Sequence, residues 1–484
     1  MARNYTREFL ELCCFSEEEI EKYGPRWEFA AKQLRLDDKR MEFALDHYIP
    51  ENWDIKYMGV RKMIGAYTRE VMDAVETPQM AENGVKIVYG ILPCLSTYYN
   101  AIKVAGGDKV FIGAPDMFLS AFLNGFFNAA GPLYAEAEAR GFSYGCRHCP
   151  LNKMRLAAYA TGIIAAPDII WSWGCNCDEG PKTDEFIQHI TGKKWNYHIS
   201  RLPHDSEFAE NEWLMEDRLR YTSETLKLGM KKVEEATGIT VTDEHIAQAN
   251  ADQGRMIFKV AMATGVITNA NPPVLGGETI TMFAQTFSLP FNSGYTYIED
   301  AIDTLTKELK AAAKAGEGVM PKDTPVVGFW NVPVTVPWIN RIFRDNGVLV
   351  ILNSCMAATS LQMSPSNYPD DPWMAAAETW VRNSSNMHIK GEARELMEKL
   401  DKANLDGIIM GLFDFDRWMG AQHKMLAKII TEELGMPSYY LEGDYWDDRE
   451  YNQEALRTKI ESISQIITTR KAIKLAQQKA QAAE

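Results

Sequence analysis

The sequence lacks several features that would place it in a specialised class of protein. No apolar run approaches the roughly 20 residues that a membrane-spanning helix needs. The first residues, MARNYTREFLELCCF, carry acidic side chains where a secretory signal is apolar. Eight cysteines among 484 residues are too few for a disulfide scaffold. These absences predict a cytoplasmic protein that has no contact with a membrane.

Positive charge is also scarce. Lys and Arg total 51 against 66 Asp and Glu, so the formal net charge is −15. An acidic surface repels phosphate backbones and anionic lipids, and we therefore expect no nucleic-acid or membrane partner. The content of 46% hydrophobic residues, with 33 Gly and 21 Pro, is that of a folded globular chain. At roughly 150 residues per domain, this length indicates two or three domains.

Several common catalytic and nucleotide-binding motifs are missing. Neither G-x-G-x-x-G nor G-x4-G-K-[ST] occurs, so no dinucleotide or P-loop site is recognisable. No Ser–His–Asp arrangement or H-E-x-x-H motif stands out. If ATP is needed, another protein binds it, and the sequence assigns no catalytic residue.

Hydrophobic periodicity divides the chain into four regions. Residues 1–80 have helical spacing and form a predicted N-terminal extension, with Pro78 as a helix end. Residues 81–206 form a first α/β domain and residues 321–484 a second, which ends in a helix with a basic tail. Residues 207–320 are long amphipathic stretches that predict a helical connector. The predicted strands are 86–92, 109–113, 168–173, 195–200, 324–330, 348–354, 406–412 and 437–444.

Strands that alternate with helices predict parallel sheets with right-handed crossovers. The fold class is therefore α/β, with two Rossmann-like or flavodoxin-like parallel-sheet domains joined by a helical segment. No short motif repeats between the two domains, so we expect a topological pair and not a sequence repeat. Loops at the carboxyl ends of the strands should face the functional site.

The cysteines are the strongest chemical signal. Cys146 and Cys149 lie in GCRHCPLNKMR, and Cys175 and Cys177 follow directly on a predicted strand in WSWGCNCDEG. Thiolates are soft donors that suit an iron–sulfur cluster or zinc. Zinc is the weaker interpretation, because the second pair is C-x-C and not C-x2-C. A third interpretation is that these cysteines are simply buried as small apolar side chains. Cys355 also follows a predicted strand.

Charged residues accompany these cysteines. Lys153 and Arg155 lie next to the thiols, where they either attract an anionic ligand or form a solvated face. In the second domain, FDFDRWMG follows one strand and LEGDYWDDREYNQ the next. Asp444 and Asp448 have the character of caps for the final helix.

The order of these motifs resembles that of the 2-hydroxyacyl-CoA dehydratase and benzoyl-CoA reductase family. The resemblance covers about residues 80–475. The segments that carry it are CPLNKMRLAAYATG (149–162), PDIIWSWGCNC (167–177), LKLGMKKVEEATGITVTDEHI (226–246), GFWNVPVTVPWINRIFRDNGVLVI (328–351) and LDGIIMGLFDFDRWMGAQHKMLAKIITEELGMPSYYLEGD (405–444).

The resemblance implies a 4Fe-4S cluster in a cleft between two α/β domains. It also implies a homologous second subunit and a separate ATP-dependent iron–sulfur activator protein that delivers a low-potential electron to act on an acyl-CoA substrate. By position, Cys149 and Cys175 are the first two ligands, with Cys177 as a neighbouring candidate. Asp416 stands where the family has its third cysteine. Three possibilities remain open. Asp416 is a hard ligand, or Cys355, Cys146 or Cys177 takes its place, or the cluster has been lost.

The resemblance therefore predicts a subunit of an oxygen-sensitive iron–sulfur enzyme that dehydrates 2-hydroxyacyl-CoA thioesters by single-electron, ketyl radical chemistry. Two alternatives are a subunit of an aryl-CoA reductase of the benzoyl-CoA type and a non-catalytic partner subunit with a structural zinc or no metal. Trp171, Trp173, Trp330 and Trp418 near the predicted site suit an aromatic substrate or a packed core equally well.

Overall fold

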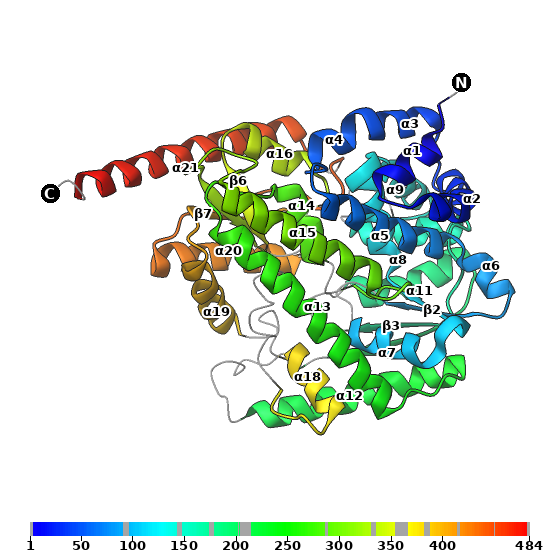
Figure 1. The fold of residues 1–484 in the computed structure, drawn as a ribbon. Coiled ribbons are helices and arrows are strands. Elements are labelled where there is room, and N and C mark those ends of the chain that lie inside the picture. The colour runs from blue at the N-terminus through cyan, green and yellow to red at the C-terminus, as the bar shows by residue number, and fades with distance from the viewer. Residues whose placement is uncertain are drawn as a thin grey trace.

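The structure is a computed structural model of the 484-residue chain (Figure 1). It describes residues 3–90, 96–142, 148–173, 179–201, 203, 214–285, 289–330, 335–353, 366–381, 388–413, 417–449 and 451–481.

A group of short helices forms the N-terminal region. These are α1 (Tyr5–Leu12), α2 (Glu17–Gln33), α3 (Asp38–Phe43), η1 (Ala44–Tyr48), α4 (Ile49–Asn52), α5 (Met58–Val75) and α6 (Thr77–Glu82). Ser16 starts α2 with a capping box, in which its side chain and that of Glu19 each accept the other residue's backbone N–H. Pro78, which the sequence marks as a helix end, lies in the first turn of α6, where its missing N–H is tolerated.

The first parallel sheet follows. Its elements are β1 (Lys86–Gly90), α7 (Ser96–Gly106), η2 (Gly107–Lys109), β2 (Val110–Gly113), α8 (Pro115–Phe122), η3 (Leu123–Phe127), α9 (Gly131–Ala139), α10 (Pro150–Ala160), β3 (Ile169–Trp173), α11 (Glu179–Thr191) and β4 (Asn196–Ser200). The strand order is β2-β1-β3-β4, and all pairs are parallel. Ile87, Val88 and Ile170 are wholly buried, because helices cover both faces of such a sheet.

Long helices separate the two sheets along the chain. They are α12 (Met215–Thr237), α13 (Asp243–Asn269), α14 (Gly277–Gln285) and α15 (Thr296–Ala315). Helix α13 packs against α7 of the first sheet and also contacts the second sheet, while α15 packs on α5. Helix α13 therefore spans the space between the two sheets with α15 beside it, whereas α12 packs on the first sheet (Figure 1).

The second sheet repeats the arrangement of the first. Its elements are β5 (Val326–Phe329), α16 (Trp338–Asp345), β6 (Leu349–Asn353), α18 (Pro372–Val381), α19 (Ile389–Lys402), β7 (Gly407–Gly411), α20 (Arg417–Ile429), η6 (Ile430–Leu434), β8 (Ser438–Leu441) and α21 (Gln453–Gln481). The order β6-β5-β7-β8 is again parallel throughout.

Both sheets therefore have their second, first, third and fourth strands in the same spatial order. The predicted fold class is confirmed, and each predicted strand is present close to its expected bounds. The domain boundaries stay a prediction. In this order the second strand lies on one side of the first strand and the third and fourth strands on its other side. Open α/β sheets bind ligands at the carboxyl ends of the strands beside such a switch point.

One continuous hydrophobic core joins the regions. It runs from Phe9 in α1 through Ile170 in β3 and Ile298 in α15 to Ile409 in β7. The ring of Phe9 stacks on that of Trp27 with centroids 4.5 Å apart, and Trp27 meets Phe122 edge-on at 5.8 Å. The N-terminal helices are thus packed onto the first sheet's helices. No helix in the described part of the chain is both long and apolar enough to cross a membrane.

Candidate functional site

In each sheet, strands near the switch point in strand order end at the segments that carry the predicted ligands. The chain leaves β3 at Trp173 and β7 at Gly411. Cys175 and Cys177 follow β3, Asp416 follows β7 and Cys355 follows β6, but these four residues and Cys146 lie outside the described residues. Cys149 is the predicted ligand that the structure places.

Cys149 lies at the amino terminus of α10. It is the residue before Pro150, and its carbonyl oxygen accepts the backbone N–H groups of Asn152 and Lys153 at 2.9 and 3.1 Å. Its side chain is partly buried against the core. Because α10 precedes β3 in a parallel crossover, its amino terminus lies at the edge where β1 and β3 end. Negative charge is stabilised at such a helix end.

Arg155, one and a half turns further along α10, is a buried cation. Its side chain is 1% exposed, and its guanidinium lies 3.3 Å from Asp116 and 3.9 Å from Asp184. Burial opposes the charge, but Asp184 and Asp116, followed by Tyr159 and Cys149, raise its pKa above the ordinary value. Burial also raises the pKa of Asp116 to about 6. The interpretation of Arg155 as part of a solvated face is therefore wrong, since two carboxylates enclose it.

A second buried cation, Lys153, belongs to a cluster that joins the two sheets' regions. Its Nζ is fully buried and lies 3.1 Å from Glu138 of α9 and 4.0 Å from Asp447. Arg449 completes the cluster, with Nη2 2.8 Å from Glu138 and 2.7 Å from Asp447. We call these four residues the inter-lobe clamp. Because α9 and α10 belong to the first sheet and residues 447–449 follow β8 of the second, the clamp holds the loop after β8 against α10.

Neutral hydrogen bonds support the same junction. Asn124 Nδ2 and the Tyr134 hydroxyl both donate to the carbonyl oxygen of Trp446, at 2.6 and 3.1 Å. Within the second lobe, the Thr335 N–H donates to the carbonyl oxygen of Tyr445 at 3.0 Å and holds the same loop from its other side. The loop after β8 is therefore bound to the first lobe by charged and neutral contacts at once.

The backbone at the end of β7 has an unusual conformation. Gly411 has φ +102, and a Cβ there would lie 2.0 Å from the carbonyl oxygen of Leu441, so only glycine fits. Leu412 has φ +57, which is rare for a branched apolar residue. Its N–H donates to that same oxygen at 2.7 Å. Such conformations cluster at functional sites, and this one lies just before Asp416 in the sequence.

His423 of α20 stabilises this turn. Its Nδ1 accepts the backbone N–H of Gly411 at 3.1 Å, and its ring lies edge-on to Phe413 with centroids 5.8 Å apart. The residue is fully buried. Burial lowers the pKa of His423 to about 4, so the ring is neutral at neutral pH.

The aspartates after β8 do not cap the final helix. Asp444 accepts the N–H groups of Trp446 and Asp447 at 2.7 and 3.2 Å, and so closes the turn that the clamp binds. Burial raises the pKa of Asp444 well above its ordinary value. Asp448 accepts the indole N–H of Trp338 at 3.1 Å. Asn452 caps α21 instead, by accepting the Ala455 N–H at 3.0 Å.

Two of the tryptophans near the site, Trp171 and Trp330, are buried in the core. Trp171 is fully buried, and its indole N–H donates to Ser200 Oγ at 2.9 Å. Trp330 is buried after β5, where its carbonyl oxygen accepts the hydroxyl of Tyr445 at 2.9 Å. The side chains of Trp173 and Trp418 lie outside the described part of the structure. Trp171 is thus a packing residue.

Within the described ranges, no three His, Cys, Asp or Glu side chains come together in a way that could hold a metal ion. The residues that sequence reasoning missed are Glu138, Asp116, Asp184 and His423. Their types are common on helices, and their partners lie far away along the chain, so no local pattern marks them. Only the apolar residues around Asp116, in APDMFLSAF, could have indicated a buried charge.

A comparison with protein families identifies the relationship. The family model of the 2-hydroxyglutaryl-CoA dehydratase D-component matches residues 114–467, which include β3, β4 and the whole second sheet. The chain belongs to this family. It is therefore a dehydratase-type component of the 2-hydroxyacyl-CoA dehydratase family. No curated protein matches the chain significantly.

Proposed function

We propose that this chain is the cluster-bearing subunit of a 2-hydroxyacyl-CoA dehydratase, which removes water from an acyl-CoA thioester by single-electron chemistry. The observation that carries the proposal is the family match, which covers about three quarters of the chain, with two strands of the first sheet and the whole second sheet. A homologous second subunit and an ATP-dependent iron–sulfur activator complete the proposed enzyme.

The donor chemistry fits a 4Fe-4S cluster at the first lobe's edge. Cys149 is a partly buried thiol at a helix amino terminus, near the Arg155 guanidinium. Both surroundings stabilise the thiolate that iron requires. Cys175 is the proposed second ligand and Asp416 the third, with Cys146, Cys177 and Cys355 as replacements. A carboxylate in place of a thiolate would hold iron less tightly.

A bound cluster would supply one low-potential electron to the acyl-CoA thioester to give a ketyl radical anion, and loss of the 2-hydroxyl group and of a β-proton would then yield the enoyl-CoA with the electron returned to the cluster. The chain's own residues build the surroundings. The inter-lobe clamp keeps the loop after β8 against α10. The neutral ring of His423 holds the turn at Gly411, and Phe413 after that turn packs edge-on against Tyr445 and Trp446 of the loop after β8. A closed junction excludes water, which would otherwise quench radical intermediates.

Metal analysis of protein purified without oxygen tests the proposal. We expect about four irons and four acid-labile sulfides per chain, with a brown chromophore. Zinc without iron, or no metal, would contradict the cluster and indicate a structural or substrate-binding subunit. With activator and ATP, dehydration of a 2-hydroxyacyl-CoA would support the dehydratase. Reduction of an aryl-CoA ring would instead identify the enzyme as an aryl-CoA reductase.

Two substitutions locate the ligands. Cys149→Ala should lose most of the iron, because one donor is removed, whereas Cys14→Ala, a partly buried cysteine in the N-terminal region, should retain it. Asp416→Cys should slow iron loss to a chelator if Asp416 is the third ligand. An unchanged rate of loss would place Asp416 outside the ligand set.

A further inference from the structure

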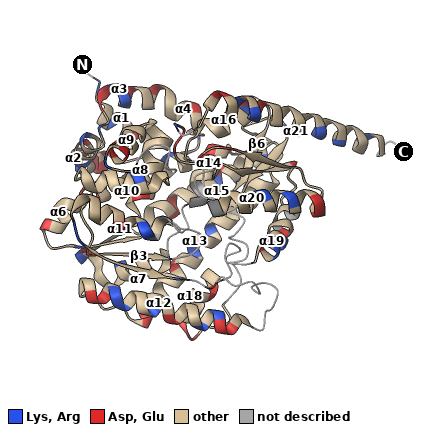
Figure 2. Cartoon of the chain, turned by 180° about the vertical axis from the view of Figure 1, so that it is seen from behind, with Lys and Arg blue, Asp and Glu red and all other residues tan. Residues whose placement is uncertain are grey.

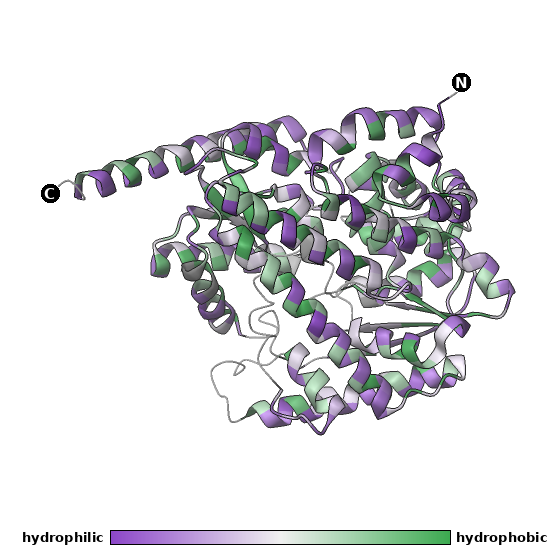
Figure 3. Cartoon of the chain, in the orientation of Figure 1, coloured by the Kyte–Doolittle hydropathy of each residue, from purple (hydrophilic) through white to green (hydrophobic). Residues whose placement is uncertain are grey.

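The last helix, α21, extends beyond the body of the protein. Its buried residues are Leu456, Ile460, Ile463, Ser464 and Ile467. From residue 468 to residue 481 none of its residues is buried, and Ile473 is 54% exposed. Figures 1 and 3 show this part projecting from the molecule with apolar and polar residues side by side. An isolated helix as short as this projecting part is only marginally stable in water unless it packs against another surface.

The projecting part of α21 lies beyond the segment that matches the family. The matched segment ends at residue 467, which is also the last buried position of the helix. We call residues 468–481 the tail. Because the tail contributes no buried side chain, a fold-stabilising role does not explain why it is a continuous helix.

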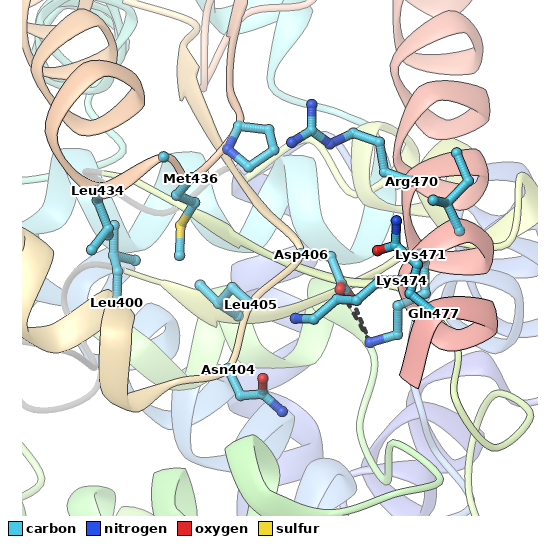
Figure 4. Close-up of a pocket in the computed structure, with 13 residues that line it drawn as sticks. Leu400, Asn404, Leu405, Asp406, Leu434, Met436, Arg470, Lys471, Lys474 and Gln477 are labelled. Carbon is cyan, nitrogen blue, oxygen red and sulfur yellow. Dashed lines mark hydrogen bonds and ion pairs between the residues drawn. The ribbon is translucent and has the colours of Figure 1, made fainter. Parts of the chain in front are cut away.

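A groove runs between the tail and the second lobe (Figure 4). It has a volume of about 510 Å³. It lies beside the amino-terminal ends of β7 and β8, on the opposite edge of the sheet from the candidate site. Its apolar lining residues are Leu400, Leu405, Leu434, Met436, Pro437 and Ile473.

The tail side of the groove is basic. Lys471 Nζ is paired with Asp406 at 2.9 Å, so its charge is compensated. Arg470 and Lys474 also line the groove, and neither makes an ion pair with any described residue. The tail contains four basic residues and no acidic one, although the whole chain has a formal charge of −15. Figure 2 shows this basic character along the outer part of α21.

We propose that this groove docks an acidic, amphipathic helix of the second, non-identical subunit of the enzyme. Apolar residues on such a helix would cover Leu434, Met436 and Ile473, and its carboxylates would meet Arg470 and Lys474. The choice of a partner subunit rests on the proposed function, in which the chain is one component of a larger enzyme. A nucleic acid or an anionic membrane would be repelled by the acidic remainder of the chain.

A photo-crosslinking experiment on the co-expressed, co-purified complex tests the docking. Gln477 lines the groove, whereas Ala472 lies on the tail but not in the groove. With p-benzoyl-phenylalanine at position 477, we expect a cross-link to an acidic helix of the partner subunit, identified by mass spectrometry. The same probe at position 472 should give little or none.

Charge reversal gives a second readout. Arg470→Glu with Lys474→Glu should weaken binding of the partner subunit by roughly tenfold or more, and raised salt should weaken wild-type binding in the same direction. Lys310→Glu with Lys314→Glu on α15 is the matched control, with the same spacing on a different exposed surface, and should bind normally.

The outcomes separate the docking from the proposed function. A complex that binds equally well after charge reversal, with no cross-link at 477, would overturn the docking and leave the proposed function standing. A cross-link to another copy of this chain, or to lipid or nucleic acid, would overturn it as well. If no second subunit co-purifies at all, the pairing in the proposed function fails first.

Discussion

The two sheets share one topology but differ in the chemistry at their carboxyl edges. The first edge has Cys149 at a helix amino terminus, with Arg155 buried between Asp116 and Asp184. The second edge has a kinked backbone at Gly411 and the neutral ring of His423. Each sheet thus provides a carboxyl edge at which a site can form, and the side chains at that edge determine its chemistry.

The largest expected effect is at the first edge. Arg155→Met leaves Asp116 and Asp184 buried without their cation, so we expect a loss of about 3 to 5 kcal/mol in the free energy of unfolding. Urea unfolding measures it. Arg220→Met, which breaks an exposed ion pair with Glu216, should cost at most about 0.5 kcal/mol. Equal losses in the two variants would show that the first edge does not depend on a buried charge.

The second edge should be sensitive to backbone shape instead. Gly411→Ala introduces a Cβ against the Leu441 carbonyl at a positive φ, so we expect a loss of about 3 kcal/mol. Gly435→Ala is the control, because Gly435 also has a positive φ but open space around it. It should cost about 1 kcal/mol in the same unfolding experiment. A smaller loss for Gly411→Ala than for the control would contradict the tight turn.

Acid should weaken the second edge through His423. The pKa of His423 is about 4 in the folded chain, below the roughly 6.5 of an unfolded histidine. The unfolded chain therefore takes up a proton first, so this contribution is full above about pH 6.5 and is lost as the pH falls toward about 4. Between about pH 7 and about pH 4.5, wild type should lose about 2 kcal/mol more than His423→Asn.

The histidine control uses an exposed residue. His47→Asn should follow the wild-type pH curve, because the side chain of His47 is 65% exposed. Carboxylates titrate in all three proteins and cancel in the difference. Parallel curves for wild type and His423→Asn would show that the ring is not buried in its neutral form.

The smallest effect tests whether the two edges are coupled. A double-mutant cycle of Glu138→Gln and Arg449→Met should give a coupling energy of about 1 kcal/mol, since the pair joins the lobes in a partly buried cluster. The exposed pair Glu216 and Arg220 should give about 0.3 kcal/mol. Additive effects of Glu138→Gln and Arg449→Met would mean that the clamp does not join the lobes energetically.

Much of the fold could be predicted from the sequence. The strands are short, nearly continuous apolar runs such as KIVYG and GIIMG, which are typical of parallel strands covered on both faces. The helices that connect successive strands also followed from the hydrophobic periodicity. The burial of Lys153 and Arg155 did not, because a basic residue gives no local sign of the carboxylate that will enclose it.

The sequence by itself determined the strands, most of the helices, the α/β class and the family resemblance, because hydrophobic periodicity and motif spacing act over a few residues. The tertiary structure alone decided which charges meet. Glu138 and Arg449 are 311 positions apart, and Asp116 and Arg155 are 39 apart. A buried charge is tolerable only when folding supplies its counterion. The pair of Asp116 and Arg155 forms within the first lobe, and the pair of Glu138 and Arg449 forms only once the two lobes have come together.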